Sequence, residues 1–295
     1  MIQMPAGQIP GFYHRRIGDI VVTALSDGYL DGTLEVLQNI TRDDARGLLD
    51  AQFRPGRRTS VNCYLIYAGG RLALVETGSG DYLLPTAGKL QQNLKAAGVD
   101  PADIDTILLT HMHPDHSAGL TDPKTGKKLF PNAELVVHEN EPKHWNDDGA
   151  MSRASERARK MYFQCAREQI APYHNVTRTF AREQEVFPGV SSVLLHGHTP
   201  GHSGYRVSSG RESLLIWGDI IHVPEIQVPR PEVTIEFDTD PHQAAAAHKR
   251  TFDMVVTDRQ LIAGMHVHFP GFARLVHDGD GYRMLPEPWD QGFGG

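Results

Sequence analysis

The chain has 295 residues, of which 40% are hydrophobic and 22% are charged, and its formal net charge is −7. No segment approaches the roughly 18 consecutive apolar residues of a membrane span, so the sequence predicts no transmembrane helix and no membrane partner. The acidic balance argues against a nucleic-acid groove, which needs a basic surface, and two cysteines suggest no disulfide framework.

Strands and helices are predicted to alternate along the chain. The predicted strands are 20–25, 62–67, 72–75, 104–109, 135–138, 192–195, 214–217 and 259–264. Helices are predicted over 86–97 and 150–170, and a third begins at Asp240-Pro241, where an N-cap Asp precedes Pro in the first turn. This order predicts an α/β or α+β class. Because no internal repeat or low-complexity linker interrupts it, residues 1–295 are predicted to form a single domain.

The segment 111–116, with the sequence HMHPDH, directly follows the predicted strand 104–109. Zinc is usually bound by His nitrogen and carboxylate oxygen. A spacing of two brings His111 and His113 to one side of an extended segment, and Asp115 and His116 follow a proline at which the chain can turn. Four ligands are too many for one catalytic zinc, which keeps a position open for water. We therefore interpret the segment as half of a two-metal site rather than as a solvated loop.

This hexapeptide resembles the signature of the metallo-β-lactamase-fold superfamily. The resemblance implies three further ligands, and His198 in a Gly-rich turn, Asp219 after a strand and His266 near the C-terminus occupy these positions in order. The implied ligands of one metal are His111, His113 and His198; those of the other are Asp115, His116 and His266; and Asp219 bridges both. The implied fold is an αββα sandwich, in which two facing mixed sheets carry two Zn²⁺ ions at one edge.

The chemistry expected of two such metals is hydrolysis. Divalent ions about 3.5–4 Å apart can share a hydroxide at neutral pH and polarise a carbonyl or phosphoryl oxygen. The residues predicted to be catalytic are Asp115, Asp219 and His222. His222 stands where related lactonases often carry a Tyr, so it either contacts the substrate or is a structural His. Glu76 stands where the family usually has an Asp that supports a metal-binding His, and its alternative is a strand-end carboxylate that faces solvent.

Within the superfamily, the chain resembles the methyl parathion hydrolase-like branch. The segments that carry this resemblance are 23–28, 217–223, 229–235 and 265–271. The branch contains organophosphate hydrolases, aryl esterases and N-acyl-homoserine lactonases, commonly homodimers. The resemblance implies a homodimeric enzyme that opens lactones or cleaves aryl esters, with side activity on phosphotriesters. The absence of an obvious basic clamp predicts that anionic substrates are poor. Four aromatic residues are candidates for a pocket wall, with the core as their alternative place: Phe53, Trp145, Phe163 and Phe269.

Other functions stay open at this point. An organophosphate hydrolase would use the same residues, and a single-iron thiol dioxygenase has an overlapping ligand set. A non-catalytic metal-binding module is the alternative that is not an enzyme. True β-lactamases of this fold generally lack a bridging Asp at position 219, and a flavodiiron oxidoreductase would need a flavin domain. Residues 1–7 have no charged n-region and no apolar h-region, so a cytoplasmic protein is predicted, although a trimmed secreted form would begin in the same way.

Overall fold

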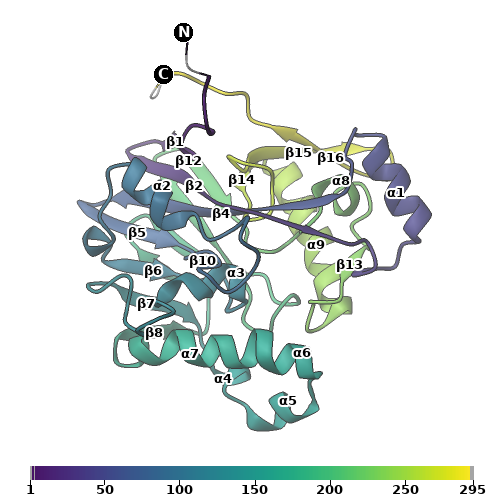
Figure 1. The fold of residues 1–295 in the computed structure, drawn as a ribbon. Coiled ribbons are helices and arrows are strands. Elements are labelled where there is room, and N and C mark those ends of the chain that lie inside the picture. The colour runs from purple at the N-terminus through teal and green to yellow at the C-terminus, as the bar shows by residue number, and fades with distance from the viewer. Residues whose placement is uncertain (1, 3, 293–295) are drawn as a thin grey trace.

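The computed structural model describes residue 2 and residues 4–292, which form two seven-stranded sheets and one small two-stranded sheet (Figure 1). The first sheet has the order β1-β2-β4-β5-β6-β7-β8, with β1 Phe12–Ile17, β2 Ile20–Gly32, β4 Arg57–Ala68, β5 Arg71–Val75, β6 Thr106–Leu108, β7 Glu134–His138 and β8 Thr177–Phe180. The second sheet has the order β16-β15-β14-β12-β11-β10-β9, with β9 Glu185–Phe187, β10 Val190–Leu194, β11 Ser203–Ser209, β12 Glu212–Ile216, β14 Leu261–Ala263, β15 Phe272–Asp278 and β16 Gly281–Pro286. The small sheet pairs β3 Leu37–Gln38 with β13 Thr234–Ile235.

The helices lie between these strands in the chain. The α-helices are α1 Arg42–Asp50, α2 Leu90–Ala96, α3 Pro114–Ser117, α4 Asn140–Trp145, α5 Asp148–Arg153, α6 Glu156–Ala158, α7 Cys165–Ile170, α8 Pro224–Gln227 and α9 Pro241–Thr257. The other helical segments are 3₁₀ turns at η1 Pro101–Asp103, η2 Ala118–Leu120 and η4 Ala171–Val176, and a π-helix at η3 Arg159–Gln164. No helix in the described part of the chain is long and apolar enough to cross a membrane.

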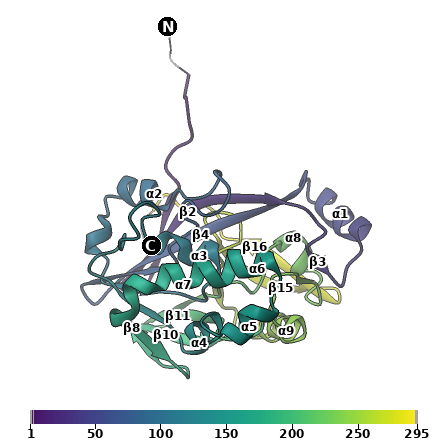
Figure 2. The same ribbon diagram turned by 60° about the horizontal axis from the view of Figure 1, so that its bottom comes forward.

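The side chains of each central strand alternate between two apolar layers. In β4, Tyr64 and Ile66 face the layer between the two large sheets, whereas Cys63 and Leu65 face the layer under α2 and α7. Successive side chains of a strand point to opposite faces, so an uninterrupted apolar run marks a strand that is buried on both sides. The outer face of the second sheet is covered in the same way by α9. The layers are therefore helix, sheet, sheet and helix, and the predicted αββα sandwich is confirmed (Figures 1 and 2).

Pairs of parallel strands bring several loops to one edge of this sandwich. The first sheet is antiparallel from β1 to β5 and parallel from β5 to β8. In the second sheet, β12 and β14 are parallel neighbours. Loops that leave the carboxyl ends of parallel strands emerge at the same edge, so ligands placed in these loops come together there.

The single helix predicted over 150–170 is wrong, because the structure breaks it into α5, α6, η3 and α7. Ala154 ends α5 with an extended backbone, and the Ser155 hydroxyl then accepts the N–H of Ala158 as the N-cap of α6. Serine favours such caps because its hydroxyl satisfies an N–H that has no partner within the helix. Figure 2 shows α7 and α6 in a row across the molecule, with η3 between them in the chain.

Candidate metal centre

Three strands deliver predicted ligands to the same edge of the sandwich. Each ligand comes three residues after its strand ends: His111 after β6, Asp219 after β12 and His266 after β14. Ile216 lies opposite Ala263 in the parallel pair of β12 and β14. Because the two strands end in register, Asp219 and His266 leave the sheet side by side.

The loop after β6 continues into the short helix α3, which places the rest of the first motif. His113 has extended backbone angles and precedes the helix, and Pro114 is the first helical residue. Proline suits this position because the first N–H groups of a helix have no partner within it. Asp115 and His116 therefore lie on a helical turn, whereas the residues before it are extended. His198 approaches from the loop between β10 and β11.

The seven predicted metal ligands form two adjacent groups. The first group is His111, His113 and His198, and the second is Asp115, His116, Asp219 and His266; within each, the ligand atoms lie within 4.8 Å of one another. Oδ2 of Asp219 is 3.1 Å from Nε2 of both His116 and His266, 3.5 Å from Nε2 of His198 and 3.7 Å from Nε2 of His111. One carboxylate oxygen thus faces both groups.

Several atoms of these groups are buried without a hydrogen-bond partner. They are Nε2 of His111, both ring nitrogens of His116 and Oδ1 of Asp219. Leaving a buried polar atom unpaired costs about 1–3 kcal/mol, so such atoms are uncommon in folded proteins. Imidazole nitrogens and carboxylate oxygens are the donors that zinc and related transition metals prefer. The donor set therefore fits two divalent metal ions.

The electrostatics of the two groups differ. Burial lowers the pKa of each imidazole in the first group well below its usual value, which favours the neutral form that binds metals. In the second group, burial also opposes the charged form, but the Asp219 and Asp115 carboxylates outweigh it and raise the pKa of His266 to about 10. The second group therefore concentrates negative charge that attracts cations.

His202 orients the loop that carries Asp219. Its Nδ1–H donates to the carbonyl oxygen of Leu195 at 2.8 Å, and its Nε2 accepts the backbone N–H of Asp219 at 2.9 Å. Since both ring nitrogens are used in this way, His202 holds Asp219 in place rather than offering a nitrogen to a metal.

Two buried carboxylates contact histidines of the groups. Glu76 accepts the backbone N–H of Thr110 at 2.9 Å and lies 3.6 Å from Nδ1 of His116. It is fully buried, so the solvent-facing alternative for Glu76 is wrong. Asp238, which the sequence analysis missed, accepts the Nδ1–H of His198 at 2.7 Å. Metal-binding histidines commonly use their second nitrogen in this way, but no spacing in the sequence connects Asp238 to His198.

Glu141, also missed from the sequence, links the two loops that carry the first group. One of its oxygens accepts the Thr199 hydroxyl at 2.5 Å and the Gly201 N–H at 2.9 Å. The other accepts the Met112 N–H at 2.9 Å and the indole N–H of Trp145 at 2.8 Å. Its carboxylate is fully buried, and these four donors satisfy it. Glu141 therefore sets the distance between the two loops.

Of two further histidines, His222 contacts the ligand groups and His268 does not. Nε2 of His222 is 3.1 Å from Oδ2 of Asp219, and its ring stacks on that of His266 with centroids 5.0 Å apart. His222 therefore lies in the wall of the site, where it also forms a third possible ligand group with His198 and Asp219. In contrast, Nε2 of His268 pairs with Glu225 at 2.6 Å, away from both groups.

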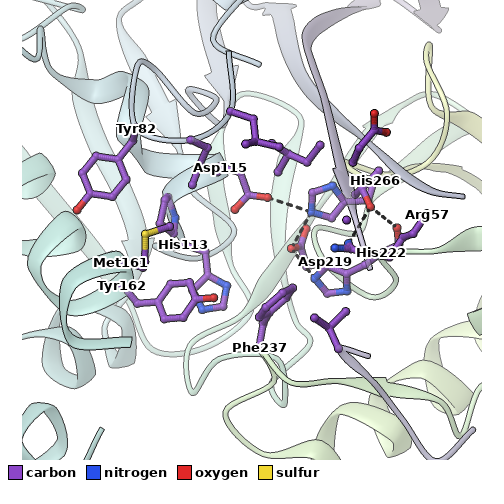
Figure 3. Close-up of a pocket in the computed structure, with 18 of the residues that line it drawn as sticks. Arg57, Tyr82, His113, Asp115, Met161, Tyr162, Asp219, His222, Phe237 and His266 are labelled. Atoms are coloured by element: carbon purple, nitrogen blue, oxygen red, sulfur yellow. Dashed lines mark hydrogen bonds and ion pairs between the residues drawn. The ribbon is translucent and has the colours of Figure 1, made fainter. Parts of the chain in front are cut away.

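A cavity of about 610 Å³ opens over the two groups (Figure 3). Its polar side includes His113, Asp115, Asp219, His222 and His266. Its apolar and aromatic lining residues are Leu30, Val36, Tyr82, Leu83, Leu84, Met161, Tyr162 and Phe237. Such a mostly apolar wall beside a few polar groups is typical of a site for a small molecule.

The aromatic residues proposed for the pocket wall lie elsewhere. Trp145 and Phe163 are buried under the first sheet, whereas Phe53 and Phe269 are exposed on the surface. None of the four is among the described residues that line the cavity. That prediction is therefore wrong; the wall comes instead from β2 and the loop after it, from the loop before α2 and from η3.

Two basic residues that the sequence analysis did not place at the site, Arg57 and Arg157, also line the cavity. Both guanidinium groups already have protein partners. Arg57 donates from Nε to the carbonyl oxygen of Thr33 at 2.8 Å, and Arg157 lies 3.4 Å from Glu236. These arginines therefore bring less free positive charge to the cavity than their number suggests.

Two solved structures share this fold over nearly the whole chain. The crystal structure of the hydrolase AbOPH, of the beta lactamase superfamily, superposes with a TM-score of 0.91 at 31% identity, covering 97% of this chain and all of that one. AidC, a dizinc quorum-quenching lactonase in complex with its product N-hexanoyl-L-homoserine, superposes with a TM-score of 0.89 at 25% identity, covering 95% and 99% of the two chains.

Sequence relatives point to the same group. An N-acyl homoserine lactonase of Bacillus thuringiensis is 24% identical over 237 residues, which cover 72% of this chain and 84% of that protein. An atrochrysone carboxyl ACP thioesterase of Passalora fulva is 33% identical, but the match spans 90 residues and only 25% of that protein. The model of the metallo-beta-lactamase superfamily matches residues 56–265. The chain thus belongs to the metallo-beta-lactamase superfamily, as a hydrolase related to N-acyl homoserine lactonases.

Proposed function

We propose that this protein is a dinuclear zinc hydrolase that opens lactones, such as N-acyl-homoserine lactones, or cleaves aryl esters. The observation that carries the proposal is the position of Asp219, whose Oδ2 lies 3.1–3.7 Å from imidazole nitrogens of both ligand groups. A single carboxylate placed in this way suits a bridge between two ions. The proposed metal ligands are His111, His113, Asp115, His116, His198, Asp219 and His266.

Two bound divalent ions supply a nucleophile at neutral pH by lowering the pKa of a water, and they polarise the substrate carbonyl. The residues of the chain would hold the ions in place and orient the substrate. Asp219 holds the two groups at a fixed separation, and Asp115 adds a second carboxylate at the cavity floor. His222 presents its ring at the cavity wall, and its Nδ1 is buried without a partner. We propose that His222 contacts an oxygen of the substrate.

The cavity supports a neutral substrate with an apolar arm. Leu83, Leu84 and Phe237 offer a hydrophobic surface beside the polar floor, as an acyl chain or an aryl ring requires. AidC, whose structure superposes on most of the chain, is a lactonase. The substrates we propose are therefore neutral lactones and aryl esters, with lower activity on phosphotriesters and poor activity on phosphomonoesters. We further propose that the chain acts as one domain and as a homodimer.

Steady-state kinetics of the zinc-loaded protein test this proposal. The panel comprises acyl-homoserine lactones of increasing chain length, aryl esters, β-lactams, paraoxon-type phosphotriesters and a phosphomonoester. We expect the highest kcat/KM for a lactone or an aryl ester, with KM falling as the acyl chain lengthens along the apolar wall.

Three results would change the assignment. A phosphotriester that is cleaved with a higher kcat/KM than every lactone and ester would make organophosphate hydrolysis the better name. Bound metal without turnover on any member of the panel would favour a non-catalytic metal-binding module. Oxygen consumption with a thiol substrate, together with iron in place of zinc, would favour a dioxygenase.

A further inference from the structure

Tyr162 reaches the cavity from an irregular helical turn. It belongs to the π-helix η3, which lies between α6 and α7, and its neighbour Met161 also lines the cavity. A π-helix has more residues per turn than an α-helix, so consecutive side chains diverge by a smaller angle. This lets Met161 and Tyr162 both face the cavity, as Figure 3 shows. Single π turns occur frequently at functional sites.

The ring of Tyr162 packs beside the proposed metal centre. Its centroid is 4.8 Å from that of His113, 6.3 Å from Trp145 and 6.5 Å from Phe237. In Figure 3 the hydroxyl points away from the helix toward the side of the cavity where Asp219 and Phe237 lie. The three aromatic contacts hold the ring, so the position of the hydroxyl is well defined.

The hydroxyl of Tyr162 has no hydrogen-bond partner among the described residues, unlike the other hydroxyl groups around it. Tyr82 donates its hydroxyl to the carbonyl oxygen of Lys160 at 2.9 Å, and Thr59 donates to that of His222 at 3.3 Å. Thr33 interacts with the carboxylate of Glu35. Tyr162 is thus the lining residue whose hydroxyl is left for a ligand, at a place where the protein supplies no acceptor.

Tyr162 also has the right protonation state for a donor. A phenol is protonated at neutral pH, so the Tyr162 hydroxyl can donate a hydrogen bond. When an ester or lactone is attacked, negative charge develops on its carbonyl oxygen. Preorganised donors aimed at that oxygen are a major source of rate enhancement in acyl transfer.

We propose that the hydroxyl of Tyr162 donates a hydrogen bond to the carbonyl oxygen of the bound substrate. The inference rests on the proposed hydrolysis of lactones or esters at this site. It divides substrate contact between two residues: His222 from the loop after β12, and Tyr162 from η3. The phenol retains its proton throughout, so its contribution is electrostatic, and it is strongest as the carbonyl oxygen becomes an oxyanion.

The variant Tyr162→Phe tests this assignment, because it removes the hydroxyl and keeps the ring that packs on His113. With the best substrate of the panel, we expect kcat to fall about 10²–10³-fold, as when one oxyanion donor is removed elsewhere, with a smaller change in KM. Metal content and melting temperature should match wild type. The control is Tyr282→Phe, a tyrosine paired with Asp253 far from the cavity, whose kcat should remain that of wild type. Wild-type kcat in Tyr162→Phe would overturn the proposal.

A second pair of variants covers the case in which the Phe variant loses stability. Tyr162→Gln restores a donor without the ring, and Tyr162→Leu has similar bulk but no donor. We expect the Gln variant to be the faster of the two; equal rates would show that a hydrogen-bond donor at this position contributes nothing and would contradict the proposal.

A readout without turnover separates this inference from the proposed function. Calorimetry measures the binding of N-hexanoyl-L-homoserine, whose carboxylate retains the carbonyl oxygen, to the zinc-loaded protein. If wild type hydrolyses no lactone or ester, the proposed function fails, and the binding experiment still decides on Tyr162. Weaker binding by Tyr162→Phe than by Tyr282→Phe supports the hydrogen bond, and equal binding contradicts it.

Discussion

Asp238 accepts a hydrogen bond of 2.7 Å from Nδ1 of His198, although the two residues are 40 positions apart in the chain. This bond fixes the ring so that Nε2 faces Nδ1 of His113, 2.9 Å away, where the first metal is proposed to bind. Oxygen Oδ2 of Asp238 accepts the N–H of Ile235, so the carboxylate is itself held in place. Asp238 therefore orients a proposed ligand without facing the metal.

Replacing Asp238 should weaken metal binding without removing a ligand. In Asp238→Ala the His198 ring is free to rotate, and we expect about 10–100-fold lower affinity for one zinc ion. Competition with a chromophoric chelator measures this affinity. Glu236→Ala, two residues away and on the surface, is the control and should bind zinc as wild type does. Equal affinities in the two variants would contradict the orienting role.

Protein purified without chelator should contain close to two transition metal ions per chain. The Asp219 carboxylate faces both ligand groups, so Asp219→Ala should lose at least one ion and most of the activity. Elemental analysis by mass spectrometry measures both stoichiometries. If the wild-type protein bound only one ion per chain at saturation, and this ion were mainly iron, the result would contradict the two-metal assignment and favour the dioxygenase.

Replacing each of the two histidines near the C-terminus should affect metal binding and activity very differently. His266 donates from Nδ1 to the carbonyl oxygen of Ser60 at 2.7 Å and turns Nε2 toward Asp219 at 3.1 Å. His268 instead pairs with Oε1 of Glu225, an oxygen that Nε of Arg54 also contacts at 2.7 Å. We expect His266→Ala to lose metal and activity and His268→Ala to retain both. If His268 were the more sensitive residue by metal analysis, the ligand assignment would be wrong.

Glu141 should be important for stability although it lies outside the proposed ligand set. Glu141→Gln replaces one carboxylate oxygen with an amide NH₂ group. The N–H or O–H groups that donated to this oxygen then face another donor and lose their acceptor. Each buried donor left unpaired costs about 1–3 kcal/mol, so the variant should unfold at lower denaturant concentration. Looser loops around Met112 and Thr199 should also lower zinc affinity.

The neighbouring variant Glu139→Gln is the matched control for Glu141. Glu139 forms a partly exposed pair with Lys143, and exposed pairs contribute only about 0–1 kcal/mol. Urea unfolding that ranks Glu139→Gln below Glu141→Gln in stability would contradict the account of Glu141.

The sequence by itself determined the α/β or α+β class and the ligand-rich segment 111–116, because both appear in local patterns. The resemblance to a known family supplied the layers of the fold and the remaining candidate ligands. Apolar runs such as that of β12 identify strands buried on both faces. His111 and Asp219 stand at a fixed distance after such strands, so their place at a sheet edge follows from the strand alone. The helix over 150–170 was misjudged because composition there favours helix throughout, and the cap at Ser155 that breaks it depends on one hydroxyl.

Only the tertiary structure decided what surrounds the ligands. Asp238, Glu141 and Tyr162 reach the site from segments whose own sequences carry no sign of it. Their roles depend on which loops meet at one edge of the sandwich. That meeting is set by the register of strands and by the packing of helices over whole layers. A buried carboxylate or phenol acquires its function from the donors and acceptors around it, and those come from distant parts of the chain.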